Sequence, residues 1–114
     1  MDILMIKQPW GEKILNGEKT WEIRGSGTSK RGRIALAFSK TGAKYGEVEL
    51  VDSIPLTEEL WKSGCVKAGL PDVSWKELLE MYKAPYAWVM QNPQKYKAPV
   101  PFTPKRGAVI WVRE

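Results

Sequence analysis

The sequence has 114 residues, a length that predicts one domain, residues 1–114, with a hydrophobic core large enough to fold without disulfides or a structural metal. It contains no histidine and a single cysteine, which excludes an intramolecular disulfide, zinc sites built from cysteine and histidine, and Ser-His-Asp triads. The net charge of +5 favours an anionic partner, although a solvated basic surface is the simpler explanation of the charge alone. We expect no metal and no cofactor.

The first element is a short apolar run over residues 3–7, which predicts a buried strand. The beginning of the sequence lacks the basic region and the small-residue cleavage site of a secretory signal. No stretch of about 18 apolar residues predicts a membrane span. Together with the lone cysteine, these features predict a cytoplasmic protein without membrane contact, and we expect a monomer.

A short helix follows the first strand. Pro9 suits a first helical turn, Trp10 and Ile14 lie one turn apart, and Gly17 stands where a left-handed residue ends a helix. Residues 20–24 then alternate as a strand does. This alternation places Lys19, Trp21 and Ile23 on a largely apolar face and Thr20, Glu22 and Arg24 on a polar face.

The middle of the chain predicts two strands and two helices. Residues 33–38 alternate between large apolar and small side chains, after a loop over residues 25–32 that is rich in glycine and hydroxyl groups, and residues 47–54 form a further strand. Thr57 can cap a helix that ends at Gly64. A second helix begins at Ser74, where Ser74 and Glu77 have the spacing of a capping box. Its apolar stripe consists of Trp75, Leu78, Leu79 and Tyr82.

The last third of the chain predicts a strand over residues 86–90, broken by Asn92 and Pro93. An irregular, basic, proline-rich connection over residues 94–106 follows, and a β-branched strand over residues 108–112 ends the pattern. The order β-α-β-β-β-α-α-β-β predicts an α+β fold: a small, mainly antiparallel β-barrel, closed or nearly closed, of five or six strands with two or three short helices around it.

Charged residues gather at two places that favour an anion site. Lys19 precedes the second strand, and Glu22 and Arg24 project from one face of it, where Glu22 can orient the two cations toward a phosphate or carboxylate. Arg31 and Arg33 follow the glycine-rich loop, whose free amides also suit phosphate. The alternative for each group is an ordinary solvated surface, and spacing alone favours that alternative.

The sequence is rich in aromatic residues, which hold unpaired bases in many single-stranded nucleic-acid-binding proteins. Most of the rings stand at positions typical of a core. Trp10 and Trp21 adjoin the charged residues and are the candidates for stacking on a base. Cys65 lies among cations, but no histidine can activate it, so an incidental thiol is the better interpretation.

Several motifs in order resemble the ASCH domain, the activating signal cointegrator homology domain of the PUA-like superfamily. Its G-x-K-x-x-E-x-R element is matched at every specified position, by Gly17, Lys19, Glu22 and Arg24. Further matching stretches extend over nearly the whole chain: Ile6 to Trp10, Arg31 to Ile34, Tyr45 to Leu56, Tyr86 to Val89 with Asn92-Pro93, and Pro101-Phe102 with Lys105 to Gly107.

The resemblance implies a small β-barrel with a cleft that binds RNA beside the motif. The implied nucleic-acid-binding residues are Lys19, Glu22 and Arg24, with Arg31 and Arg33 alongside. To these we add Trp10 or Trp21 as the stacking residue, because each adjoins the charged residues in the sequence. Our leading hypothesis is therefore an RNA-binding module.

The resemblance also implies an enzymatic alternative, because some small bacterial members of the superfamily hydrolyse the amide of acetylated cytidine and others are credited with ribonuclease activity. In a small metal-independent hydrolase of a modified nucleoside or of RNA, Lys19 and Glu22 are the candidate catalytic residues. Lys19 matches the lysine of the amidohydrolases, whereas Glu22 stands where they have threonine, a departure that argues against the same chemistry. A protein-interaction domain, or a reader of a modified DNA base, is a third alternative for the same cleft.

Overall fold

The structure is a computed structural model that describes residues 1–103 and 110–113. The elements of this part of the chain follow the predicted order. They are β1 (Asp2–Ile6), α1 (Trp10–Leu15), β2 (Trp21–Arg24), β3 (Gly32–Phe38), β4 (Ala43–Pro55), α2 (Glu58–Gly64), α3 (Trp75–Met81), β5 (Tyr86–Pro101) and β6 (Trp111–Arg113). None of the described helices is both long and apolar enough to cross a membrane.

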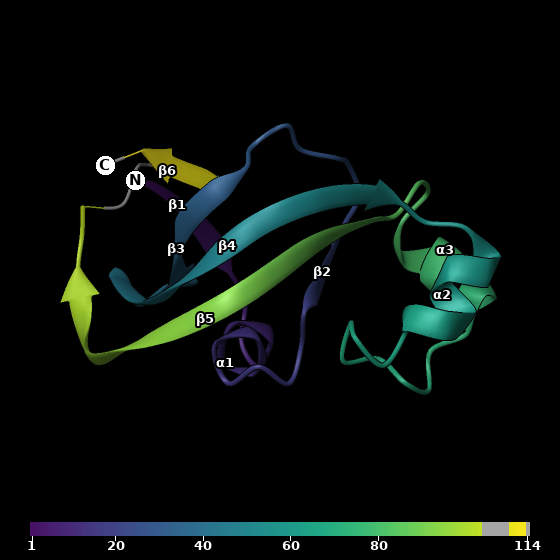
Figure 1. Ribbon diagram of the computed structural model, residues 1–114, viewed down its shortest axis with the longest axis horizontal. Helices are drawn as coiled ribbons and strands as arrows, with labels where there is room; N and C mark the ends of the chain where they lie inside the picture. Colours follow the sequence, from purple (N-terminus) through teal and green to yellow (C-terminus); the bar gives the residue numbers. More distant parts are fainter. Residues whose placement is uncertain (104–109, 114) are drawn as a thin grey trace.

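All six strands belong to one sheet with the order β2-β5-β4-β3-β1-β6 (Figure 1). Among the described strands, β1 and β3 are the only neighbours that pair in parallel, and the other neighbouring strands are antiparallel. The predicted mainly antiparallel α+β fold is therefore confirmed. The sheet curls into a half-barrel rather than closing completely, and β2 and β6 are its edge strands.

The main core fills the hollow of this curl, where α1 packs onto the sheet. Ile34, Leu36 and Phe38 of β3 point into the core, as the alternation predicts. Ile14 and Leu15 of α1 pack against them together with residues of β4 and β5. On the other face of β3, the small side chains Ala35 and Ala37 lie in a separate buried cluster with Ile3 and Val112.

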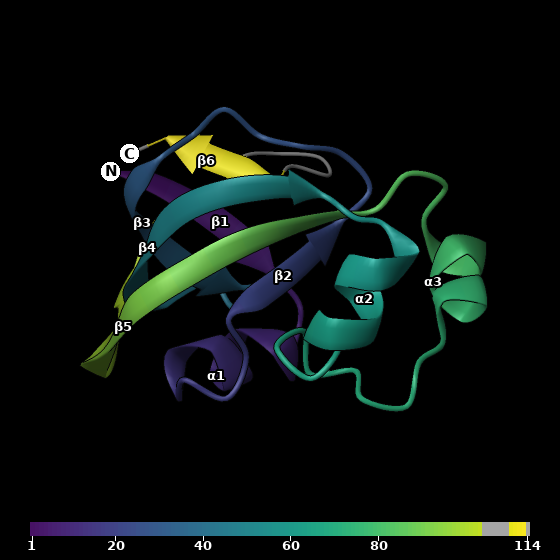
Figure 2. The same ribbon diagram turned by 45° about the vertical axis from the view of Figure 1, so that its right-hand side comes forward.

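A second buried cluster joins β2 and β5 to the two helices α2 and α3 (Figure 2). The predicted caps of both helices are present: the Thr57 hydroxyl accepts a hydrogen bond from the Leu60 amide, and Ser74 and Glu77 form a reciprocal capping box. The predicted apolar stripe of α3 is narrower than expected. Leu78 is fully buried, whereas Leu79 is 41% exposed, because this seven-residue helix presents only one side to the cluster.

The prediction of a break at Asn92 and Pro93 is wrong, and so is the irregular connection after it. Strand β5 has 16 residues and continues to Pro101, since the 13-residue β4 pairs with it from Tyr86 to Pro101. Pro93 is tolerated because it lies at an irregularity of the ladder, where the register with β4 shifts between Glu47 and Glu49. On its other side, β2 covers only residues 86–89 of β5. Residues 104–106 of that connection, and residues 108–109 of the last predicted strand, lie outside the described residues.

Candidate functional site

The candidate site begins with the turn that ends α1. Gly17 has a φ of +81°, the left-handed conformation predicted for it, and it redirects the chain from the helix into β2. The amide of Lys19 donates a hydrogen bond back to the carbonyl of Lys13. This turn delivers Lys19 to the entrance of β2, at the edge of the sheet.

Lys19, Glu22 and Arg24 form one charged cluster, which we call the motif cluster. The ammonium of Lys19 lies 3.5 Å from Glu22 Oε1, and both Nε and Nη2 of Arg24 lie 3.0 Å from Glu22 Oε2. Lys19 is only 3% exposed and Glu22 only 6% exposed. The alternative of a solvated surface ion pair is therefore wrong for this cluster.

The prediction that Lys19 and Glu22 lie on opposite sides of the strand is also corrected. Strand β2 begins at Trp21, so Lys19 belongs to the preceding turn and is not bound by the alternation of the strand. Its ammonium also donates a hydrogen bond of 2.7 Å to the carbonyl of Ala68 and lies 5.1 Å from the ring centroid of Trp10. Burial lowers the pKa of Lys19, and the nearby carboxylate of Glu22 opposes this shift.

Arg24 is held on three sides. Besides Glu22, its Nη2 donates to the carbonyl of Met5 at 3.1 Å, and its guanidinium carbon lies 5.4 Å from the ring centroid of Trp88. The side chain of Arg24 is 18% exposed. The sheet edge β2 is thereby tied to β1 across the open side of the half-barrel.

Within the part of the chain that the structure describes, three cavities border the motif cluster. One of about 280 Å³ touches the cluster only at Lys19, and the other two are both lined by Glu22. The larger of these two, which we call the seam cavity, has a volume of about 330 Å³, close to the lower limit of typical small-ligand pockets. It is lined by Met5, Lys7, Trp10, Glu22, Ile23, Arg24, Ser39, Tyr82 and Ile110. A smaller cavity of about 160 Å³ shares Trp10, Glu22, Ile23 and Tyr82 with it and adds Lys19, Leu70 and Met81. Among the described residues, Glu22 is the only carboxylate that lines either cavity.

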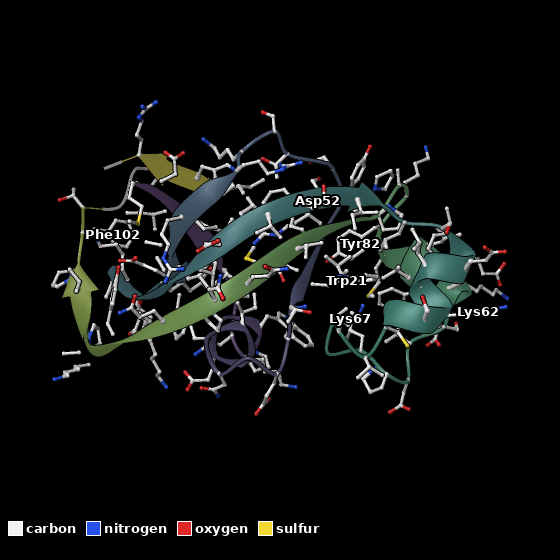
Figure 3. The ribbon with its side chains drawn as sticks, in the orientation of Figure 1. Trp21, Asp52, Lys62, Lys67, Tyr82 and Phe102 are labelled. Atoms are coloured by element: carbon white, nitrogen blue, oxygen red, sulfur yellow. The ribbon has the colours of Figure 1, made fainter. Side chains whose placement is uncertain are left out.

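The two candidate stacking residues lie in different environments. Trp10 is partly exposed and lines both cavities. Trp21 is only 7% exposed and lies within the second core cluster, packed against Gly64 of α2, near the labelled side chain of Tyr82 in Figure 3. Its burial corrects the expectation of a stacking surface at this position.

The structure does not bring Arg31 and Arg33 to the motif cluster. Arg31 lies 3.6 Å from the carboxylate of Asp52, and Arg33 pairs with Glu47 and Glu49 of β4. Arg33 alternates with the inward-pointing Ile34, and neither arginine lines the two cavities. The expectation that they lie alongside the cluster is wrong, because nearby acidic side chains engage them elsewhere on the sheet.

Three residues that the sequence reasoning passed over line the seam cavity: Lys7, Ser39 and Tyr82. They come from three separate segments, after β1, after β3 and after α3. For Lys7 the sequence does hold a signal, since Lys7 lies between the first strand and Trp10. For Tyr82 the sequence predicts only a place in the apolar stripe of α3, because no local pattern distinguishes a core tyrosine from one that borders a cavity.

Comparison with known proteins decides the family. The model of the ASCH domain matches residues 4–100, most of the chain and all of the motif cluster. The chain belongs to the ASCH domain family. No curated protein matches the sequence.

Solved structures of an ASCH protein from Zymomonas mobilis share the fold of this ASCH domain. The first aligns with a TM-score of 0.75 and 17% identity, and it covers 99% of this chain and 87% of the other. Two single-substitution variants of the same protein also align with a TM-score of 0.75. One variant is 17% identical and covers 99% of this chain and 90% of its own. The other is 18% identical and covers 99% of this chain and 88% of its own. At this identity the likeness shows the fold, which is the PUA-like α+β architecture.

Proposed function

We propose that this ASCH domain binds single-stranded RNA and holds one nucleobase in the seam cavity. The observation that carries the proposal is the cavity itself, where the rings of Trp10 and Tyr82 meet the charged groups of Glu22 and Arg24. An aromatic wall offers stacking to any base, and the polar groups can hydrogen bond to the edge of that base. Membership of a family associated with RNA binding supports the same function.

The phosphates of the bound strand contact lysines at the mouth of the cavity. Lys7 lines the seam cavity and is exposed, and Lys13 lies with its ammonium 5.4 Å from the ring centroid of Trp10. Neither lysine forms an ion pair with a described acidic side chain, so both ammonium groups are available to a phosphate. The motif cluster has a different role. Lys19 and Arg24 neutralise Glu22 and shape the floor beneath the base.

The salt dependence of RNA binding tests this proposal. Fluorescence anisotropy of a fluorescein-labelled single-stranded decamer, titrated between low and physiological KCl, gives the slope of log Kd against log salt concentration. Lys7→Ala and Lys13→Ala each remove one phosphate contact. The magnitude of this slope is therefore smaller by about 0.7 in each variant than in wild type. Lys62→Ala is the matched control, because Lys62 is exposed on α2 (Figure 3) and paired with Glu58. A wild-type protein that binds no RNA at low salt overturns the proposal.

A hydrolase is the second candidate, favoured by the burial of Lys19 beside Glu22 at the wall of a cavity. Because burial lowers the pKa of Lys19, the neutral amine is more accessible to it than to an exposed lysine. In this candidate mechanism the amine acts as base or nucleophile, Glu22 acts as acid and base, and Arg24 stabilises the developing anion. The hydrogen bond from Lys19 to the Ala68 carbonyl makes this the second candidate, since the amine is already engaged.

Turnover of acetylcytidine, or of a labelled RNA, tests the hydrolase. Activity that is lost in Lys19→Ala while RNA affinity stays within a few-fold of wild type supports it. Activity that is equal in wild type and Lys19→Ala removes Lys19 from the chemistry.

A further inference from the structure

Trp10, Glu22, Ile23 and Tyr82 line both the seam cavity and the smaller cavity beside it. Among the described residues, Tyr82 is the only one of these that lies outside α1 and the G-x-K-x-x-E-x-R element. It follows the last turn of α3, where its amide donates a hydrogen bond of 2.9 Å to the Leu78 carbonyl. Its ring packs against the second core cluster. The backbone and the ring are therefore held in place before any ligand arrives.

The hydroxyl of Tyr82 differs from the charged groups of the site in its hydrogen bonding. No described residue forms a hydrogen bond with it, whereas the ammonium of Lys19 and the guanidinium of Arg24 are both engaged by protein acceptors. Partial burial and the carboxylate of Glu22 raise the pKa of Tyr82, so the phenol stays protonated and keeps its O–H donor. A fixed ring with an unused donor at the wall of a cavity is suited to bind a polar atom of a ligand.

We propose that Tyr82 is a specificity-determining residue of this ASCH domain, which donates a hydrogen bond to the edge of the nucleobase held in the seam cavity. The inference rests on the proposed RNA binding. The proposed hydrogen bond distinguishes one base from another, because the acceptor atoms on the edges of the bases differ in position. Glu22 complements it as an acceptor for the base's N–H donors.

Removal of the hydroxyl oxygen of Tyr82 tests this inference. Tyr82→Phe keeps the ring and its packing, and it removes no hydrogen bond to a described residue, so we expect its midpoint of urea unfolding to match wild type. Tyr45→Phe is the matched control, because Tyr45 stacks on Phe38 with ring centroids 4.1 Å apart and lines neither cavity. The affinities of both variants and of wild type are compared for decamers of adenosine, of cytidine and of uridine.

We expect Tyr82→Phe to lower the affinity for the decamer that wild type binds best by about fivefold, which corresponds to the loss of one neutral hydrogen bond. The affinity for the decamer that wild type binds most weakly should stay nearly unchanged. The preference among the three decamers therefore narrows, while Tyr45→Phe keeps it. Equal affinities of Tyr82→Phe and wild type for all three decamers overturn the inference but leave RNA binding intact. An equal loss for all three also overturns it, since the hydroxyl then contacts the common backbone. If wild type itself binds none of them at low salt, the proposed function fails first.

Discussion

Arg24 donates a hydrogen bond to the main-chain carbonyl of Met5 although three strands of the sheet, β5, β4 and β3, separate their own strands. Such a contact is possible only because the sheet curls until β2 faces β1. The same guanidinium holds the carboxylate of Glu22. One side chain thus links the family motif to the closure of the half-barrel, and the seam cavity lies where that link is made.

Arg24→Lys should lower the free energy of unfolding by about 2 kcal/mol, because an ammonium cannot hold Glu22 and the Met5 carbonyl with the geometry of a guanidinium. Urea unfolding followed by tryptophan fluorescence measures the loss. Arg31→Lys is the control, since its exposed pair with Asp52 contributes little. Equal free energies of unfolding for the two variants would show that the contacts of Arg24 with Glu22 and Met5 do not stabilise the fold.

Glu22→Gln should destabilise the fold by about 3 kcal/mol, because it leaves the buried charge of Lys19 and the partly buried charge of Arg24 without their common anion. The double variant Lys19→Met/Glu22→Gln should lose less than the sum of the two single variants, since the two side chains interact directly. A double-mutant cycle by urea unfolding tests this coupling. Simple additivity would contradict the geometry of the motif cluster.

The stability of the wild type relative to Lys19→Met should rise with pH on the alkaline side. The pKa of Lys19 in the folded protein lies below its unfolded value of 10.5. Between the lowered pKa and 10.5 the unfolded chain binds more protons than the folded one, so stability increases with pH in that window. Unfolding of both proteins in urea from pH 7 to pH 10.5 gives the difference. A difference that stays constant or falls would contradict the shift.

Gly64→Ala should destabilise the fold by about 2 kcal/mol despite the better helix propensity of alanine. A Cβ at Gly64 would overlap the ring of Trp21, which is itself buried. At Gly25 the nearest described atom to a Cβ would belong to Tyr82, at the ordinary contact distance of 3.6 Å, so Gly25→Ala is the matched control with little expected effect. Thermal unfolding of both variants is the measurement, and similar melting temperatures would argue against the packing of α2 on β2.

The two tryptophans should separate binding from stability. Trp10→Leu should weaken RNA binding by about tenfold, as for the loss of one stacked base, with a smaller effect on folding. Trp21→Leu should do the opposite, because its ring fills the second core cluster. Anisotropy with labelled RNA and urea unfolding are measured side by side on both variants. A Trp10→Leu protein with wild-type affinity would remove Trp10 from the binding surface.

The order of strands and helices follows from local patterns, and so the sequence could predict it. Alternation over residues 33–38 identified the inward face of β3, and the capping box at Ser74 identified the start of α3. Failures came where a distant partner overrides local chemistry. Prolines and lysines after Asn92 are typical of a loop, but pairing with β4 keeps β5 extended to Pro101.

For the candidate site, the sequence by itself determined the motif residues Gly17, Lys19, Glu22 and Arg24, because their spacing is local to one turn and one strand. Only the tertiary structure decided that Lys19 and Glu22 are buried together, since Lys19 reaches Glu22 from a turn and finds a second acceptor at Ala68. It also decided that Arg31 and Arg33 pair with acids elsewhere and that Tyr82 borders the cavity. These outcomes depend on how the curl of the sheet brings together segments far apart in the chain, and no short stretch of sequence encodes that.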